Sequence, residues 1–394
     1  MNAVGIVAEY NPFHNGHLYH LKEAKRRSGC AYAVCVMSGH FTQRGEPAMA
    51  DKWTRARAAL LAGADVVLEL PFLYAAMPAN RFAYGAVKIL SSLGPITHLA
   101  FGSEDAAAME RFRAAARYLH TEEFQRLLKS YLPKEPSYPI AYAKALAKIS
   151  GLPEVIFSLP NNILALEYLK ALNSLHSPMI PLPIQRKGAQ HKDLGLSVYA
   201  SGSAIRRGRE KDLKSLPSVL PPAVWELVKD LKWVQPKDLA PYLFGRFRTM
   251  DAVALRQIFD VNEGLENRLL RAFRVTNYEL AWKELRCKRY SNARLQRILL
   301  YALLGVTQNE MLTLDAFGRP VYARILGFRK AASPLLREIQ DSAALPVITK
   351  AADFHPSGGL DMLWKRDLMA TDFYSLLRDH GPSGRDYISG PVIL

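Results

Sequence analysis

Short apolar runs alternate with longer amphipathic stretches through the first half of the chain. Apolar runs that end at a Gly, Pro or polar turn predict buried strands at residues 4–8, 31–37, 65–70, 97–102 and 179–184. Apolar side chains at helical spacing predict helices over residues 18–27, 51–62, 80–91, 110–149 and 163–172. A further strand is expected to end at Ser158, with Asn161 and Asn162 capping the helix that follows. This alternation predicts right-handed βαβ units, and therefore an α/β fold with a Rossmann-like parallel sheet.

Polar residues follow several of these strands, at the edge where the carboxyl ends of parallel strands meet. They are His14 and His17 after the first strand, Gln43 and Arg44 after the second, and Gly102 and Ser103 after the fourth. Ligands bind at this edge in open α/β sheets. We therefore expect these residues to surround one crevice.

The two histidines are three positions apart, at the junction between the first strand and the helix that follows it. Helix N-terminal N–H groups and fixed imidazole donors both stabilise phosphate charge, including the charge that develops when a nucleophile attacks an α-phosphate. Gly16, between the histidines, lets the backbone come close to a nucleotide. Such pairs are also common as helix caps or as chance lookalikes of metal sites. The position between strand and helix favours the phosphate interpretation.

A serine-rich turn far downstream offers similar chemistry. Ser201-Gly202-Ser203 opens a helix that carries Arg206 in its first turns, so hydroxyls, N–H groups and a guanidinium would meet phosphate oxygens together. Serine is also a routine helix cap. Together with the upstream histidines, this turn is expected to complete one site.

The proline-rich stretch at residues 215–222 is the strongest boundary signal in the chain, because closely spaced prolines interrupt helices. It predicts a boundary between an α/β catalytic domain at residues 1–214 and a mainly helical, basic region at residues 223–394. We assign no chemical role to residues 346–394.

Charge suggests what the second region binds. The 394-residue chain has a formal net charge of +16 and a pI near 9.7, which favours nucleic acid, before a membrane surface, as partner. Residues 201–300 hold 20 Lys and Arg against 11 Asp and Glu. We expect Arg294 and Arg297 to grip RNA there, with Tyr290 and Asn292 contacting unpaired bases. The competing interpretations are a solvated helix face and a merely basic enzyme.

The cysteines and the start of the chain favour a cytoplasmic protein. Cys30, Cys35 and Cys287 form no C-x-x-C pair, so we expect neither a disulfide framework nor a zinc site. Met1 leads directly into a strand, and no run of 18 apolar residues occurs. We therefore expect neither export nor a membrane span.

The string His14-Asn15-Gly16-His17 resembles the HxGH motif of the nucleotidylyltransferase superfamily, and Ser201–Arg206 resembles its second signature, Ser-x-Ser-x-x-Arg. Longer strings narrow the resemblance. Together they are similar to the bacterial tRNA(Met) cytidine acetate ligases, and they lie at residues 8–17, 37–53, 63–71, 101–104, 160–168 and 286–305.

The resemblance implies an enzyme that uses ATP, with Mg²⁺, to adenylate acetate and then acetylates N4 of the wobble cytidine of elongator tRNA(Met). We expect His14 and His17 to be catalytic, no residue to ligate a metal, and neither a protein partner nor a membrane to be involved. The resemblance implies an ATP site formed by Val7, Ala8, Glu9, Tyr10, Asn11, Pro12, Phe13, Asn15, Gly16, Leu18, Tyr19, His20, Gly102, Asn162, Arg186 and Lys187. We also expect Ser201, Ser203 and Arg206 to hold the outer phosphates, and Gln43-Arg44 to orient acetate or to screen its charge.

Two alternatives stay open from the sequence. One is adenylyl transfer to a small molecule of the pantetheine or nicotinamide type, which explains the histidines but leaves the basic half without a role. The other is a non-catalytic RNA-binding protein built on a decayed nucleotidyltransferase core.

Overall fold

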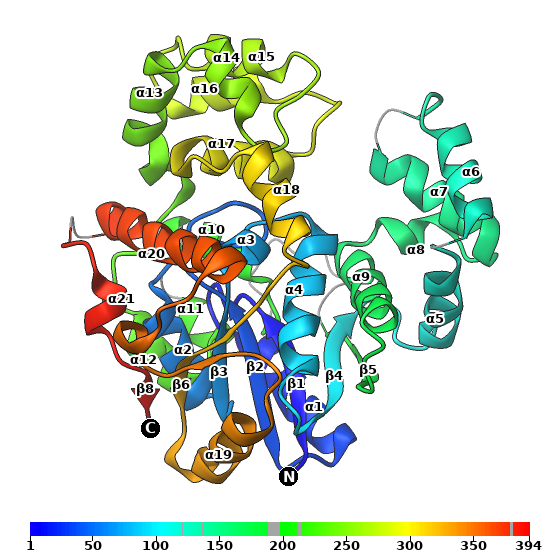
Figure 1. Ribbon diagram of the computed structural model, residues 1–394, viewed down its shortest axis with the longest axis vertical. Helices are drawn as coiled ribbons and strands as arrows, with labels where there is room; N and C mark the ends of the chain where they lie inside the picture. The colour runs from blue at the N-terminus through cyan, green and yellow to red at the C-terminus, as the bar shows by residue number, and fades with distance from the viewer. Residues whose placement is uncertain (120, 136–137, 188–197, 212–214, 379–380) are drawn as a thin grey trace.

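An eight-stranded sheet forms the centre of the protein (Figure 1). The computed structural model describes all residues except 120, 136–137, 188–197, 212–214 and 379–380. The strands are β1 (Ala3–Ala8), β2 (Tyr32–Ser38), β3 (Val66–Leu70), β4 (Ile96–Ser103), β5 (Ile180–Gln185), β6 (Ala323–Phe328), β7 (Val347–Ile348) and β8 (Val392–Ile393). Their order is β5-β4-β1-β2-β3-β6-β7, and β8 pairs with β6.

The first five strands are parallel, and each begins and ends within one residue of its predicted bounds. β1 lies between β2 and β4, so successive strands are added on one side of β1 up to β3 and then on its other side. The fold class predicted from the sequence is therefore confirmed. This reversal creates a topological switch point at the carboxyl ends of β1 and β4, where ligands bind in such folds.

Helices cover both faces of the sheet because its central strands are apolar on both sides. Val34 and Val36 of β2 belong to the core that includes α4 (Ala79–Ser91) and α9 (Pro160–Ser174). The alternate residues Ala33, Cys35 and Met37 belong to the core with α1 (Asn15–Ser28) and α2 (Lys52–Leu61). Because alternate residues of a strand point to opposite faces, β2 packs against a separate helical layer on each face of the sheet.

A small helical lobe is inserted between β4 and α9, and Figure 1 shows it at the right of the molecule. It contains α5 (Met109–Tyr118), α6 (Glu122–Tyr131), α7 (Tyr138–Ser150) and α8 (Glu154–Ser158). The strand predicted to end at Ser158 is wrong, since α8 occupies that stretch. Asn161 and Asn162 lie in the first turn of α9, whose N-cap is Leu159.

The proline-rich stretch forms two short helices that pack against the first half of the chain. These two helices are α11 (Leu216–Val219) and α12 (Pro222–Val228), and α10 (Gly202–Lys211) precedes them. Each has proline in its first turn, where a missing N–H costs nothing, so these prolines begin helices as well as interrupt them. The Asn15 side chain donates to the Ser218 carbonyl over 2.9 Å, which ties this stretch to α1.

A second, larger helical lobe lies beyond the carboxyl ends of the strands (Figure 1). We call it the upper lobe; it comprises α13 (Ala240–Thr249), α14 (Ala252–Gln257), α15 (Leu265–Ala272), α16 (Tyr278–Leu285) and α17 (Asn292–Leu304). The 3-10 turn η2 (Pro236–Leu239) leads into it and α18 (Gln308–Ala316) leaves it. Contacts that join it to the catalytic half include the hydrogen bonds that Tyr301 donates to the Ala76 carbonyl and that Gln296 donates to Glu46.

The chain then returns to the sheet, which the sequence did not predict. β6 pairs antiparallel with β3, and β7 and β8 pair with β6. The intervening elements are η3 (Lys330–Ala332), α19 (Ser333–Ser342), η4 (Ala351–Asp353), α20 (Gly358–Arg378) and α21 (Arg385–Ile388). Residues 346–394 therefore have a structural role, because they extend and cover the edge of the sheet beside β3.

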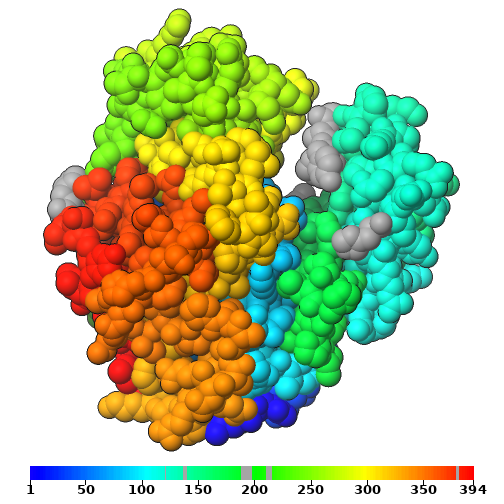
Figure 2. Space-filling view, in the orientation of Figure 1, coloured from blue at the N-terminus to red at the C-terminus, as the bar shows by residue number. Residues whose placement is uncertain are grey.

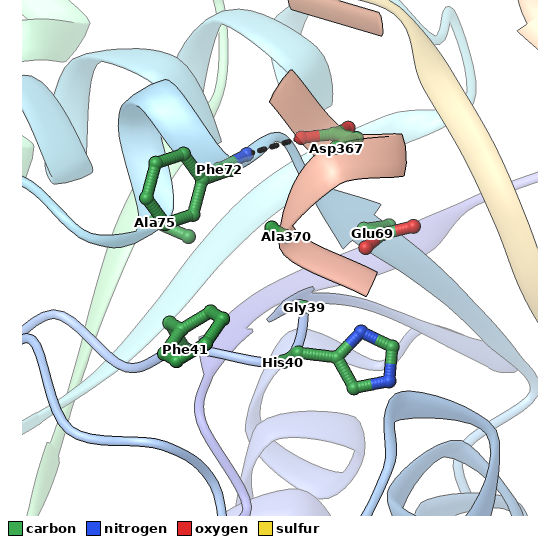
Figure 3. Close-up of a pocket in the computed structure, with 8 residues that line it drawn as sticks. All are labelled: Gly39, His40, Phe41, Glu69, Phe72, Ala75, Asp367 and Ala370. Atoms are coloured by element: carbon green, nitrogen blue, oxygen red, sulfur yellow. Dashed lines mark hydrogen bonds between the residues drawn. The ribbon is translucent and has the colours of Figure 1, made fainter. Parts of the chain in front are cut away.

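Buried charges fasten this returning segment to the catalytic half. Lys52 of α2 contacts Glu69 of β3 over 2.8 Å and Asp386 over 2.7 Å, and Arg324 of β6 contacts Asp386 over 2.7 Å. Figure 3 shows Asp367 of α20 nearby, where it accepts the Phe72 N–H beside a cavity of about 10 Å³, enough for a single water. Buried charges such as these persist only when each has a partner.

Three residues expected to contact RNA make contacts within the protein. Arg297 is buried and donates to the Gln43 carbonyl over 3.2 Å, so it joins the upper lobe to the loop after β2. Tyr290 is buried against Arg294, and Arg294 forms an ion pair with Asp260 at 2.9 Å. The expectation that Arg297 contacts RNA is therefore wrong, while the expectation for Arg294, which is partly exposed, stays a prediction. Within the described residues, no helix is long and apolar enough to cross a membrane.

Candidate active site

The end of β1 brings His14 and His17 to the switch point of the sheet. α1 begins at Asn15, and His14 is its N-cap. The Gly16 N–H donates to His14 Nδ1 over 3.1 Å, and the His14 N–H donates to His17 Nδ1 over 3.3 Å. This reciprocal capping box stacks the two rings with their centroids 3.7 Å apart. Because both Nδ1 atoms accept, Nε2 is the atom that carries the proton in each neutral ring.

Both imidazoles are neutral near pH 7. Burial lowers the pKa of His14 to about 3, and the Arg186 guanidinium acts in the same direction. Burial also holds the pKa of His17 well below its usual value, helped by His14 and Arg186, while a hydrogen bond to the Pro12 backbone acts the other way. Two neutral N–H donors beside a guanidinium form a setting that stabilises negative charge without giving up a proton.

Gly16 is required by the stacked rings as well as by the turn. A Cβ at this position would lie 2.9 Å from Cε1 of His14, closer than carbon atoms approach one another. Any larger residue would displace the His14 ring from His17. The sequence identified this glycine for its backbone freedom, and the structure adds a steric reason.

Much of the predicted ATP-binding segment supports the turn from within the core. Tyr10 and Phe13 are buried, and their rings lie 5.0 and 5.6 Å from the His17 ring. The Asn11 side chain accepts the Met49 N–H over 2.7 Å. These side chains therefore orient His17 and fix the conformation of the turn. The segment would contact a nucleotide through its backbone atoms and its shape.

Glu9, at the end of the same segment, faces the loop after β2. Its Oε1 accepts the Gln43 N–H over 2.7 Å, and burial raises its pKa against the opposing effect of that hydrogen bond. The Gln43 side chain donates to the Met77 carbonyl, while Arg44 is exposed. Gln43, one of the two residues predicted to orient acetate, is therefore held by hydrogen bonds within the protein.

The second signature docks directly on this turn. Arg206 donates to the Asn11 carbonyl over 2.7 Å and forms an ion pair with Glu46 at 3.0 Å. Ser201 Oγ accepts the Ala204 N–H and lies 3.2 Å from Ser203 Oγ. A Cβ on Gly202 would lie 2.9 Å from the Asn11 carbonyl oxygen, so only glycine permits this approach. The structure therefore brings the two signatures together.

Residues of β4, β5 and α9 lie on the other side of the histidine turn. The Arg186 N–H donates to the Ser103 carbonyl, and a Cβ on Gly102 would meet Arg186 at 3.3 Å. Arg186 Nη1 donates to Asn161 Oδ1 over 3.2 Å. The Lys187 ammonium lies 4.3 Å from the centre of the Tyr19 ring, at the rim formed by β5 and α1.

Asn162 holds this side together through both ends of its amide. Its Oδ1 accepts from Ser103 Oγ and from the Glu104 N–H, both at 3.0 Å. Its Nδ2 donates to the Ile156 carbonyl over 3.1 Å, and the residue is fully buried. The side chain therefore positions the loop after β4.

Unpartnered buried polar atoms gather around the crevice, which fits a polar ligand there. Asn11 Nδ2, Glu104 Oε2 and Arg186 Nε find no hydrogen-bond partner among the described residues. Burial lowers the pKa of His20 to about 4, with Arg186 acting in the same direction. Buried polar groups left unpaired are costly, so these atoms fit a polar ligand beside the histidine turn.

Sequence reasoning missed Arg55, which organises the floor of the crevice. This buried side chain donates to the Glu9 carbonyl over 2.6 Å, to the Ser38 carbonyl over 3.0 Å and to the Gly39 carbonyl. It thereby joins the carboxyl ends of β1 and β2. Its only sequence signal was an arginine among the apolar residues of α2, which a solvated helix face would also show.

Comparison with known proteins agrees with this geometry. The family model for HIGH nucleotidyl transferases matches residues 1–386. The tRNA(Met) cytidine acetate ligase of Thermoanaerobacter sp. (strain X514) is 38% identical, covering 98% of both chains. Its counterpart from Caldanaerobacter subterraneus subsp. tengcongensis is 40% identical, covering 95% of both chains. The crystal structure of Thermotoga maritima TmcAL bound with alpha-thio ATP superposes with a TM-score of 0.90, at 32% identity over 100% of both chains.

The chain therefore belongs to the HIGH nucleotidyl transferases and, within them, to the tRNA(Met) cytidine acetate ligase family. The resemblance stated from the sequence motifs is confirmed. It extends over the upper lobe and the returning strands as well as over the nucleotide-binding half, since the structural match covers the whole chain.

Proposed function

We propose that the protein joins acetate to ATP to form acetyl-adenylate and then acetylates N4 of the wobble cytidine of elongator tRNA(Met). The observation that carries the proposal is the stacked, neutral histidine pair beside Arg186 at the switch point of the sheet. The solved relative is described as bound with alpha-thio ATP, and the curated relatives are named for tRNA(Met) and acetate. These names support the substrates assigned here.

The first half-reaction needs no protein nucleophile. An acetate oxygen attacks the α-phosphorus, the bond to the bridging oxygen breaks, and pyrophosphate leaves with the electron pair. His14 and His17 would donate through Nε2 to the charge that builds on the α-phosphate, with His17 exchanging its bond to the Pro12 backbone for a phosphate oxygen, and Arg186 adds a fixed positive charge. Because both rings are neutral before the substrate binds, they act as donors and need not release a proton.

The outer phosphates are assigned to the second signature. The Ser201 and Ser203 hydroxyls and Arg206 face the turn at the start of α1, and Arg206 would exchange its contact with Glu46 for phosphate oxygens. Among the described residues, no cluster of three or more His, Cys, Asp or Glu side chains is placed to hold a metal ion. We therefore assign Mg²⁺ to the phosphates of ATP, where it would neutralise charge on the leaving pyrophosphate.

In the second half-reaction the exocyclic amine of cytidine attacks the acetyl carbonyl carbon. The tetrahedral intermediate collapses, AMP leaves, and N4 loses one proton. The tRNA would lie against the upper lobe, beyond the carboxyl ends of the strands (Figure 1). Because phosphate contacts release counterions, affinity for tRNA should fall steeply as salt rises.

A direct test incubates the protein with ATP, Mg²⁺, labelled acetate and bulk bacterial tRNA, and then digests the RNA to nucleosides. We expect the label in N4-acetylcytidine, only when ATP is present. Parallel reactions with phosphopantetheine or nicotinamide mononucleotide test small-molecule adenylyl transfer. Label-free RNA together with adenylylation of either small molecule would contradict the proposal.

A further inference from the structure

The upper lobe contains a cavity of about 340 Å³ that the acetylation site does not explain. It lies between α15 and the connection from α16 to α17. Ligand pockets usually begin at about 300 Å³, so this cavity can hold a group about the size of one nucleotide. We call it the α15 pocket, and its lining includes Glu263, Asn267, Arg268, Arg271, Arg289 and Tyr290.

The α15 pocket is positively charged. Arg268 donates to the carbonyls of Leu285 and Arg286, at 2.8 and 2.6 Å, so its charge is held in place by neutral groups. The Arg271 side chain is exposed and makes no hydrogen bond or ion pair with the residues that the structure describes. Arg289 pairs with Glu263 at 2.7 Å, but both side chains are at least half exposed, and such pairs contribute little.

The lining also suits a nucleobase. Arg289 lies over the Tyr290 ring, with its guanidinium 5.7 Å from the ring centre, and the Tyr290 hydroxyl donates to Glu263. Guanidinium planes and aromatic rings stack on unpaired bases, and an amide such as that of Asn267 can hydrogen-bond to a base edge. Bases inside a duplex are already stacked and cannot enter a pocket of this kind.

The position of the upper lobe indicates that the α15 pocket binds RNA. The upper lobe lies beyond the crevice, and Figure 2 shows a hollow between it and the α5–α8 lobe. An RNA that presents one unpaired cytidine to the crevice must place neighbouring nucleotides against these surfaces. We propose that the α15 pocket binds a second, unpaired nucleotide of the RNA substrate, with its phosphate on Arg268 and Arg271 and its base against Arg289. This inference rests on the proposed function.

The binding test uses Arg271→Ala and Arg289→Ala, with Arg274→Ala as matched control. Arg274 is an exposed arginine of the same lobe that does not line the pocket. The probe is a fluorescent single-stranded heptanucleotide RNA, followed by anisotropy, with the same RNA as a duplex for comparison. Each pocket variant removes a phosphate or stacking partner of one nucleotide, so we expect it to bind the single strand about tenfold more weakly.

Under this proposal Arg274→Ala weakens binding about twofold or less, since it removes only diffuse charge. Equal losses of affinity in all three variants, or equal binding of duplex and single strand, would contradict the proposal that the α15 pocket binds a nucleotide. Such a result would indicate only a basic surface. Acetate-dependent ATP–pyrophosphate exchange is measured on the same proteins. Absence of exchange in every protein, with the pocket-specific effect intact, would sink the proposed function and leave the pocket standing.

Cys287 provides a second readout in the folded wild-type chain. Its half-buried thiol lines the α15 pocket, whereas Cys30 and Cys35 are buried elsewhere. Single-stranded RNA should slow alkylation of Cys287 by N-ethylmaleimide at least fivefold, and duplex RNA should not. Unchanged alkylation at saturating single-stranded RNA would contradict the proposal.

Discussion

Arg206 donates a hydrogen bond to the backbone carbonyl of Asn11 over 2.7 Å, although the two residues are 195 positions apart in the chain. This contact joins the serine-rich turn of α10 to the histidine turn of α1. It shows how two short motifs, each common in unrelated proteins, form one site when the fold places them together. It also means that Arg206 both supports the turn and faces the crevice.

Replacement of Arg206 should therefore affect catalysis more than any other arginine of α10. We expect Arg206→Ala to reduce acetate-dependent ATP–pyrophosphate exchange about 100-fold, because one charged donor to the phosphates is removed. The matched control is Arg207→Ala, whose exposed side chain follows directly in the chain. Thermal melts of both variants check folding. Similar exchange by the two folded variants would show that Arg206 has only a surface role.

The adjacent asparagines of α9 should respond differently to the same substitution. Asn162→Ala leaves Ser103 Oγ, the Glu104 N–H and the Ile156 carbonyl without their partner, so we expect a loss of about 2 kcal/mol in unfolding free energy. Asn161→Ala releases Arg186 and should cost less than about 1 kcal/mol, while raising KM for ATP. Urea denaturation and exchange kinetics measure the two effects. Equal loss of stability in both variants would contradict this division of roles.

The buried histidines predict a stability that falls in mild acid. The pKa of His20 is about 4 in the folded protein, against 6.5 in an unfolded chain. Between these values the unfolded chain binds a proton that the folded chain does not, so stability is present above pH 6.5 and is lost as the pH falls. For one such histidine the loss between pH 7 and 5.5 is about 1 kcal/mol.

Urea denaturation at pH 7 and 5.5 tests this linkage. His20→Gln should lose about 1 kcal/mol less than the wild type over that interval, because it has no ring to protonate. His355→Gln, which replaces an exposed histidine, should keep the wild-type difference. A His20→Gln variant with the same pH dependence as the wild type would show that His20 does not titrate in this way.

The parallel core could be predicted well from the sequence and the returning segment poorly, for physical reasons. The first five strands are continuous apolar runs closed by turn residues, so their bounds follow from local pattern. β6 is also largely apolar, but no local signal shows that it pairs antiparallel with β3, because that pairing depends on residues far away in the chain, such as Asp386, which pairs with Arg324. The local pattern predicts a strand where α8 lies because five residues are too few to show a helical period.

The site shows the same division. His14, Gly16, His17 and the serine-rich turn were predicted because their chemistry depends on local spacing. Arg55 was missed and Arg297 was misjudged because a sequence reveals the charge of an arginine but not its exposure. Arg55 holds two strand ends together, and Arg297 fastens the upper lobe. Asn162 was predicted to bind the nucleotide. Its amide is hydrogen-bonded to Ser103 and to the Ile156 carbonyl.

The central claim is that His17, stacked on His14, stabilises charge on the α-phosphate of ATP. The most direct measurement is acetate-dependent ATP–pyrophosphate exchange by His17→Ala, together with its affinity for tRNA. We expect exchange to fall at least about 100-fold and tRNA affinity to stay within about twofold, because the upper lobe is untouched. Wild-type exchange by a folded His17→Ala protein would contradict the account.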